Sequence, residues 1–298
     1  MSTDQLGLAL ADPALARRTP GEEFAWAVAG GRNGADVEVP FQVPLPAAFP
    51  LFATRPRYAV RHLLKTATVS DQPVAYVHEP PDGGPGGSRV RSVSGTSYAT
   101  SPEAAFDAGV RVAGLTDLRA SVAVPKGLLD EPALLAAFVD YRVLVRLSTV
   151  ENEALLHGTA DGAITGLLHL PETRRAPLDP AFDADPAGTL TAAAAEVEET
   201  GGSCDGIVAH PVLYWRLVRD GALGRLAEAG IRISRTRMIS RDQVLLGDFR
   251  AAVTLLDPGV SMLALRRGDG PDRIEATTRT GLAVHLPQHF VLLSRDGH

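Results

Sequence analysis

The residues of this chain most able to do chemistry are its single cysteine and its eight histidines, because thiolates and imidazoles act as nucleophiles, bases and metal ligands. Cys204 stands six residues before His210, and a cysteine nucleophile requires such a base. The residues between them, Gly206–Ala209, have the pattern of a short buried strand, which would hold the two side chains apart. We therefore expect Cys204 to be a small buried apolar residue, and we expect no catalytic residues in this chain.

The histidines do not have the spacing of a metal site. His157 and His169 stand in no helical pair of histidines and beside no pair of cysteines. His285 and His289 are four residues apart, but Pro287 between them would break a helix and keep the rings from converging. We expect neither a bound metal nor a cofactor.

Two further patterns resemble sites only superficially. The glycine-rich run Gly83–Gly87 lacks the lysine and the following helix of a phosphate-binding loop, so it is better explained as a flexible loop tip. Glu151 and Glu153 would point to different faces of a helix, and the glutamates at 196, 198 and 199 resemble a solvated face. Neither group forms an acid/base pair.

Composition narrows the class of protein. The 298 residues are 45% hydrophobic and 21% charged, which is typical of a folded soluble protein. A net charge of −6 disfavours a generic nucleic-acid binder, and a lone cysteine excludes an internal disulfide framework. No stretch is apolar for long enough to span a membrane, and the N-terminal residues do not resemble a secretion signal. We expect a cytoplasmic protein with no membrane partner.

The elements that would position these residues begin with a proline-rich segment. Residues 1–50 contain six prolines and no sustained helical period, so we expect most of this range to run extended as an arm. A short helix near Pro13–Arg18 is compatible with the sequence, and Ala25–Ala29 is apolar enough to dock on a neighbouring subunit.

A long loop poor in apolar residues follows. His78–Ser101 is rich in glycine, proline and serine, and a loop of this length in a compact domain usually has a function or contacts a partner. The flanking segments Tyr58–Tyr76 and Val110–Val124 have strand patterns. We expect them to form a long hairpin whose glycine-rich tip projects from the body.

Asp130–Gly158 is predicted to be one long helix. Asp130 would cap its start, with Pro132 in the first turn, and Gly158 would end it. The expected apolar stripe consists of Leu134, Phe138, Tyr141, Val145, Ser148 and Leu155, and the opposite polar face consists of Arg142, Arg146, Thr149 and Glu153.

The remainder of the chain alternates helices and strands. We expect a helix at Ala187–Thr200, a buried strand at Gly206–Ala209, a helix at Pro211–Asp220 and a short helix ending at Gly230. Short strands rich in Val, Leu, Ile and Thr then follow, at Val244–Leu246, Ala251–Leu256, Ser261–Leu265, Ile274–Thr278 and Leu282–Leu286.

In this order the elements resemble the major capsid proteins of tailed phages, the Hong Kong bacteriophage fold, and their cellular relatives, the encapsulins, most closely the phage-capsid-like ones. The likeness spans roughly residues 57–295. It is carried by the stretches ENEALLHGTADGAITGLLHL (Glu151–Leu170), CDGIVAHPVLYWRLVRDG (Cys204–Gly221), VLLGDFRAA (Val244–Ala252) and RIEATTRTGLAVHLPQHFVLL (Arg273–Leu293).

The resemblance implies an α+β phage major capsid fold with an N-terminal arm, an extended loop, a peripheral domain holding a long spine helix, and an axial domain near the symmetry axes. The expected limits are 1–50 for the arm, 51–68 for the lead-in to the peripheral domain, 69–107 for the extended loop, 108–162 for the peripheral domain with the spine helix, 163–267 for the axial domain and 268–298 for the return to the peripheral domain.

The chain departs from some phage relatives in two respects. Residues 69–107 contain no lysine, so we expect no covalent cross-link through the extended loop. The proline-rich first 50 residues do not resemble a long helical scaffolding segment. A chain that assembles without a fused scaffold suits an encapsulin, and a phage with a separate scaffold protein remains compatible.

The leading hypothesis is a non-enzymatic encapsulin shell protein. It would assemble with itself into a closed icosahedral cage of the smallest class and enclose a cargo protein in the bacterial cytoplasm, with cargo binding near the arm and the spine helix. The alternative is a phage or prophage major capsid protein, whose partner would be packaged DNA. A hypothesis from another class is a cytosolic cysteine-dependent enzyme using Cys204.

Overall fold

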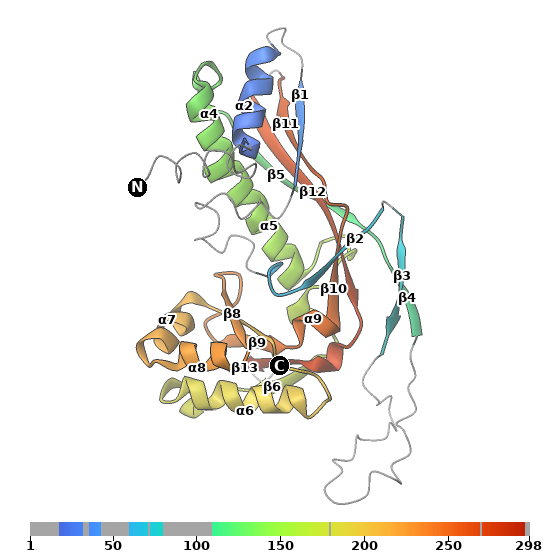
Figure 1. The fold of residues 1–298 in the computed structure, drawn as a ribbon, viewed down its shortest axis with the longest axis vertical. Helices are drawn as coiled ribbons and strands as arrows, with labels where there is room; N and C mark the ends of the chain where they lie inside the picture. The colour runs from blue at the N-terminus through green and yellow to red at the C-terminus, as the bar shows by residue number, and fades with distance from the viewer. Residues whose placement is uncertain are drawn as a thin grey trace, which may run out of the picture. The chain divides into compact units, whose positions relative to one another are not determined.

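A computed structural model describes residues 18–31, 36–42, 60–70, 72–79, 109–178, 180–268 and 270–295 (Figure 1). Contacts between residues divide the chain into two compact units. The first contains the described residues of Met1–Tyr58, Thr116–Asn152 and Asp257–Thr280, and the second contains those of Ala59–Leu115, Glu153–Leu256 and Gly281–His298.

The first unit is an antiparallel sheet packed against helices. Its strands are ordered β1, β11, β12, β5, with bounds Val37–Phe41, Ser261–Arg266, Arg273–Val284 and Thr116–Ala123. The helices are α2 (Pro20–Gly30), the 3₁₀ turn η1 (Leu128–Asp130), α4 (Pro132–Phe138), the π segment η2 (Val139–Val143) and the start of α5 (Leu144–His157). Leu147 and Leu263, both fully buried, belong to the core between the sheet and the helices.

The predicted long helix is confirmed, including its end at Gly158, with two differences, at its start and in its buried face. A 3₁₀ turn takes up Asp130, and Glu131 stands at the N-cap of α4 without a capping side-chain bond. Gly158 ends the helix with φ of +86°, a value that suits glycine. The expected apolar stripe is wrong at Leu134 and Tyr141, which are 60% and 39% exposed. The residues that are buried instead are Leu135, Val139, Val143 and Leu147.

The π segment accounts for this shifted stripe. Residues four apart drift around a regular α-helix, because one turn takes 3.6 residues. A π turn takes about one more residue, so Leu135, Val139, Val143 and Leu147 remain on one side of the helix. The sequence pattern alone did not predict this irregular turn.

The expectation that residues 1–50 run extended is wrong for much of their described part. Residues 20–30 form the helix α2, and Phe24 and Val28 are buried against α4 and the sheet of the same unit. Thr19 and Glu22 form a capping box, in which Thr19 Oγ1 accepts from Glu22 N at 3.0 Å and Glu22 Oε2 accepts from Thr19 N at 2.8 Å. The possible helix near Pro13–Arg18 lies almost wholly outside the described residues.

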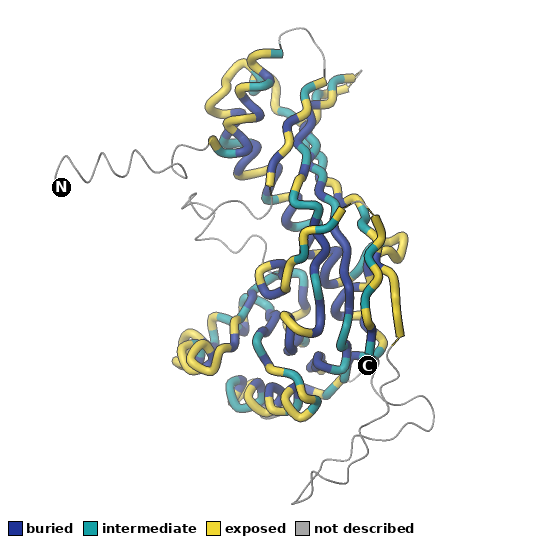
Figure 2. The backbone as a smooth tube through the Cα atoms, turned by 45° about the vertical axis from the view of Figure 1, so that its right-hand side comes forward, coloured by how far each residue is buried: buried dark blue, intermediate teal, exposed yellow. Residues whose placement is uncertain are grey.

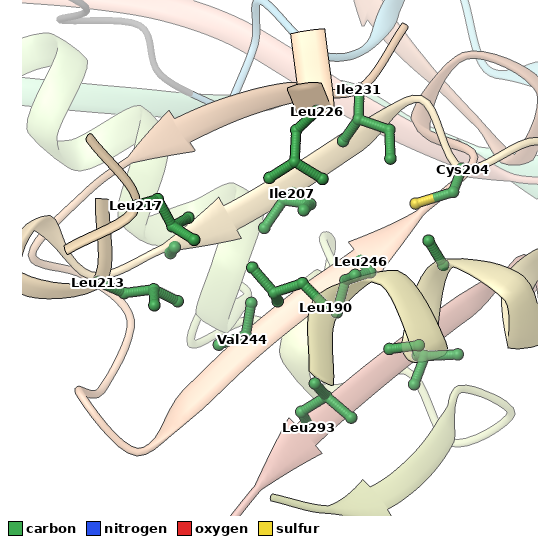
Figure 3. Close-up of a cluster of buried hydrophobic side chains, with 14 of the residues drawn as sticks. Leu190, Cys204, Ile207, Leu213, Leu217, Leu226, Ile231, Val244, Leu246 and Leu293 are labelled. Atoms are coloured by element: carbon green, nitrogen blue, oxygen red, sulfur yellow. The ribbon is translucent and has the colours of Figure 1, made fainter. Parts of the chain in front are cut away.

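A five-stranded mixed sheet forms the larger part of the second unit. Its strands are ordered β6, β13, β9, β7, β8, with bounds Arg174–Pro177, Phe290–Ser294, Gln243–Gly247, Gly206–Ala209 and Arg232–Arg235. One face is covered by α6 (Pro186–Glu198), α7 (Pro211–Arg219) and α8 (Ala222–Glu228). Figure 3 shows the core between them, where Leu190, Leu213 and Leu226 meet Ile207, Val244, Leu246 and Leu293 of the strands. The expected strand at Gly206–Ala209 and the expected helices around it are confirmed.

The long hairpin predicted from Tyr58–Tyr76 and Val110–Val124 is confirmed only in part, because residues 65–68 and 116–123 of these segments pair with other strands, β10 (Val253–Asp257) and β12. In the second unit, strand β3 (Val74–His78) pairs antiparallel with β4 (Gly109–Ala113). The glycine-rich tip Gly83–Gly87 lies outside the described residues. Strand β2 (Lys65–Thr68) pairs with β10 (Val253–Asp257), which in turn pairs with the last residues of β12.

Two strand predictions near the C-terminus are corrected. Residues 274–278 and 282–286 were expected as separate strands, but β12 runs without a break from Arg273 to Val284. Gly281, which suggested an interruption, is instead needed for close packing, since a Cβ there would lie 2.3 Å from Gly114 O. The strand expected at Ala251–Leu256 begins two residues later, at Val253, because Phe249–Ala252 form the short helix α9.

Candidate functional site

Cys204 lies at the entrance of β7, and its surroundings make it unreactive. Its side chain is buried beside Leu246 and Ile207, and Sγ lies 4.0 Å from Gly206 O. Burial, reinforced by the neighbouring Asp205 carboxylate, raises the pKa of the thiol to about 11. A thiol with this pKa is almost entirely protonated at neutral pH, so Cys204 lacks the thiolate that a nucleophile requires.

His210 lies at the other end of β7 and has a structural role. Its Nδ1 accepts a hydrogen bond from Val212 N at 3.2 Å and caps α7, whose first residue is Pro211. The whole of β7 lies between it and Cys204, and the four strand residues alone span about 13 Å. The expectation that the strand holds Cys204 and His210 apart is therefore confirmed.

The spaced histidines have separate partners. His285 Nδ1 donates to Val77 O at 2.9 Å, and its Nε2 lies 3.1 Å from Thr254 Oγ1. His289 is buried in the 3₁₀ turn η5 (Pro287–His289), where burial lowers the pKa of its ring. The rings of His157 and His169 lie 5.7 Å apart, and His157 Nε2 donates to a backbone carbonyl. Within the part of the chain that the structure describes, no three acidic, histidine or cysteine side chains gather as a metal site.

The carboxylates named from the sequence also stay apart. Glu151 is fully buried in α5, whereas Glu153 is exposed, as their expected placement on different helix faces requires. Glu198 and Glu199 are exposed at the end of α6, and Glu196 is partly exposed. These residues do not form an acid/base pair.

A polar pocket of about 280 Å³ lies at the base of the hairpin in the second unit. His78 is 2% exposed there, and its Nδ1 donates to Val284 O at 2.8 Å. Its Nε2 lies 3.8 Å from Glu172 Oε1, and Arg111 of β4 lies 3.6 Å from the same oxygen. These contacts attach both hairpin strands to the rest of the unit. The sequence did not single out His78, whose significance depends on the folded register of β3.

The exposed apolar surfaces are the features most relevant to function. In the register of the hairpin, Ala75 faces Val112 and Val77 faces Val110, so these four side chains share one face. Val77, Val110 and Val112 are 51%, 75% and 67% exposed. A strand face this apolar is covered in most soluble proteins, so it is a candidate contact surface.

Two further apolar groups are exposed on helices. Val212, Trp215 and Val218 lie on α7 of the second unit, with Trp215 59% exposed. Trp26 of α2 is 68% exposed in the first unit, beside the Arg18 guanidinium at 5.1 Å from its ring. Large apolar and aromatic side chains are enriched at protein–protein interfaces. The described surface therefore carries three exposed apolar groups of the kind found at protein–protein interfaces, and the sequence did not single them out.

The chain matches no protein-family model and no curated protein sequence. Solved structures do match its fold. The virus-like particle from Pyrococcus furiosus has a TM-score of 0.53 at 14% identity, covering 80% of this chain and 97% of the other. A structure of Microbacterium phage Oxtober96 has a TM-score of 0.55 at 16% identity, covering 79% of this chain and 90% of the other. The capsid of a native GTA particle has a TM-score of 0.53 at 16% identity, covering 80% and 90%.

The chain has the Hong Kong bacteriophage capsid fold. The α+β capsid fold expected from the sequence is thereby confirmed, at sequence identities that establish the fold alone. The limits expected for the arm, the extended loop and the peripheral and axial domains stay a prediction, because compactness does not identify which unit would lie at a symmetry axis. Among the described residues, no helix is long and apolar enough to cross a membrane.

Proposed function

We propose that this chain is the self-assembling shell protein of an encapsulin nanocompartment, which forms a closed icosahedral cage around a cargo protein in the bacterial cytoplasm. The observation that carries this proposal is the capsid fold, matched over 97% of the chain of the Pyrococcus furiosus virus-like particle. The exposed apolar faces of the β3–β4 hairpin and of α7 support it, because closed shells bury such faces between copies.

In a capsid subunit, the two units would form different domains. The second unit, with its five-stranded sheet, would supply most of the axial domain, and the first unit would supply most of the peripheral domain around α4 and α5. The hairpin would lie on a neighbouring copy, covering its own exposed strands. Cargo would bind near α2 and the spine helix.

A phage or prophage major capsid protein is the second candidate, and it is favoured by the phage capsids among the matching structures. The two functions differ in what the particle contains. Particles isolated from cells that express the chain naturally should contain one discrete protein if the encapsulin proposal is right. Particles filled with DNA, or assembly that depends on a scaffold and a portal, would replace it with the phage function.

A cysteine-dependent enzyme has little support from the geometry of Cys204. The substitution Cys204→Ala distinguishes it directly, because the shell proposal expects assembly and cargo loading to be unchanged. A loss of catalytic turnover in the variant would favour the enzyme.

A further inference from the structure

The second unit carries opposite charges on consecutive segments of the chain. Residues 179–205 contain seven acidic residues and no lysine or arginine, whereas residues 210–241 contain seven arginines and two acidic residues. The net charge of the whole chain is only −6, and it does not show that acidic and basic residues are concentrated in these two segments. A strongly dipolar surface of this kind orients a molecule toward a partner of complementary charge.

The two segments cover neighbouring parts of one face of the five-stranded sheet, and they meet where Asp183 of the acidic segment lies 3.3 Å from Arg216 of α7. The acidic segment contains α6, which packs over β9 and β13. The basic segment contains α7, α8 and the edge strand β8, and α7 contacts β8. In Figure 1, α6 runs along the lower side of this unit, with α7 next to it and α8 packed against α7.

The charged side chains at both places are available to a partner. Arg225, Arg237 and Arg241 are exposed, and within the described residues no acidic side chain forms an ion pair with them. Glu198 and Glu199 are exposed at the C-terminal end of α6 and also form no ion pair in the described part of the chain. Figure 2 colours residues by their burial, and the exposed residues of these helices are yellow.

An apolar anchor lies within the basic surface. Pro211, Val212 and Trp215 line a shallow hollow together with the side chains of Arg216 and Arg219. The Arg235 guanidinium lies 5.1 Å from the Trp215 ring and 4.4 Å from the Tyr214 ring, which fixes the orientation of both aromatic side chains. Exposed tryptophan and arginine at one place are typical of the residues that dominate binding energy at interfaces.

From these observations we propose that the basic surface formed by α7, α8, β8 and the turn at residues 236–242 of one copy binds the acidic surface of α6 on a second copy. This inference rests on the proposed shell function and specifies one of its contacts. Because the contact joins different surfaces of the two copies, it is head-to-tail, and repetition of it generates a ring when the rotation between copies closes. Exposed ion pairs contribute little each, so Trp215 and Val212 provide affinity and the charges set orientation.

Reversing the charge of each surface tests the contact. The variant Arg237→Glu with Arg241→Glu makes both surfaces acidic, and the variant Glu198→Arg with Glu199→Arg makes both basic. We expect each to lower the assembled fraction at least about tenfold at roughly 150 mM salt. Combining all four substitutions in one chain should restore assembly, and mixing the two variants in equal amounts should restore association between them.

A matched control separates local contact from net charge. Arg119→Glu with Lys126→Glu changes the net charge equally at exposed residues of the first unit, and it should reproduce neither the loss nor the rescue. Circular dichroism of each variant confirms folding, and the mixing experiment does not depend on the fourfold variant. Assembly that is no better in the combined and mixed samples than in the single-surface variants would overturn the inference. So would normal shells that only lose bound nucleic acid when Arg237 and Arg241 are reversed.

These outcomes are distinct from failure of the proposed function. If every variant forms unaltered shells, the proposed contact is refuted and the proposed shell function still stands. If the wild-type chain remains a monomer, both the contact and the shell function are refuted.

Discussion

Gly21, at the start of α2, offers a sharp test of how the N-terminal helix is held in the first unit. Gly21 N donates to the buried Asp140 carboxylate at 2.9 Å. A Cβ at this position would lie 2.2 Å from Ala136 O and 2.8 Å from the Asp140 carboxylate. The substitution Gly21→Ala therefore forces α2 away from α4 by about 1 Å, because non-bonded heavy atoms in close contact need roughly 3.2 Å or more.

Two terms set the magnitude of this effect. Overpacking of a well-packed contact costs about 1–3 kcal/mol. Weakening a hydrogen bond to a buried charged group costs about 1.5–3 kcal/mol. Since one movement relieves the clash and lengthens the bond, the two terms overlap, and we expect a loss of about 3 kcal/mol in the free energy that docks α2. This corresponds to a roughly 100-fold increase in the equilibrium constant for detachment of the helix.

Hydrogen exchange of the α2 amides measures this detachment directly. The matched control is Gly30→Ala at the other end of the same helix, where an added Cβ meets nothing within 4 Å. That substitution should leave exchange unchanged or slow it, since alanine favours a helix over glycine by up to about 1 kcal/mol. Equal exchange rates for the Gly21→Ala and Gly30→Ala variants would refute the packing described for α2.

Two further predictions concern ionisable groups in the second unit. At pH 8, Cys204 should react with a thiol-directed reagent at least about 100-fold more slowly in the folded protein than in the unfolded chain. The reason is that a thiol with a pKa of about 11 forms little thiolate at this pH. Comparable rates in the two states would contradict the burial of Cys204. Burial also raises the pKa of Asp205, so the folded state holds this proton more tightly than the unfolded chain, and stability falls as pH rises through the raised pKa. The variant Asp205→Asn keeps a side-chain oxygen that accepts from Phe249 N, and it has no carboxyl proton to lose. Its free energy of unfolding relative to the wild type, measured by urea denaturation, should therefore be higher at pH 7 than at pH 4. A relative free energy that is the same at both pH values would show that folding does not raise the pKa of this carboxyl.

The sequence predicted the elements whose local signals agree with their packing. Strand β7 is a continuous apolar run ended by Pro211, and the helix that follows begins at this proline with His210 as its cap. Such elements are buried on one or both faces, so their apolar pattern and their end signals indicate the same boundaries. The order of these elements was sufficient to indicate the capsid fold.

Elements determined by tertiary contacts were not predicted. The prolines of residues 1–50 suggested an extended arm, although the run of Thr19, Pro20 and Glu22 has the signature of a capped helix start. Gly281 suggested a strand end, but its lack of a side chain admits Gly114 O and the strand continues. The apolar hairpin face and the charged surfaces of the second unit depend on register and sheet order, which the spacing of residues along the chain does not specify.

Electron microscopy of the purified chain, after size-exclusion chromatography, tests the central proposal most directly. The shell function predicts uniform closed particles of megadalton mass and a single diameter, formed by this chain alone, and the diameter would show whether they belong to the smallest icosahedral class. A homogeneous monomer or dimer over the concentrations at which the protein is soluble would contradict the account.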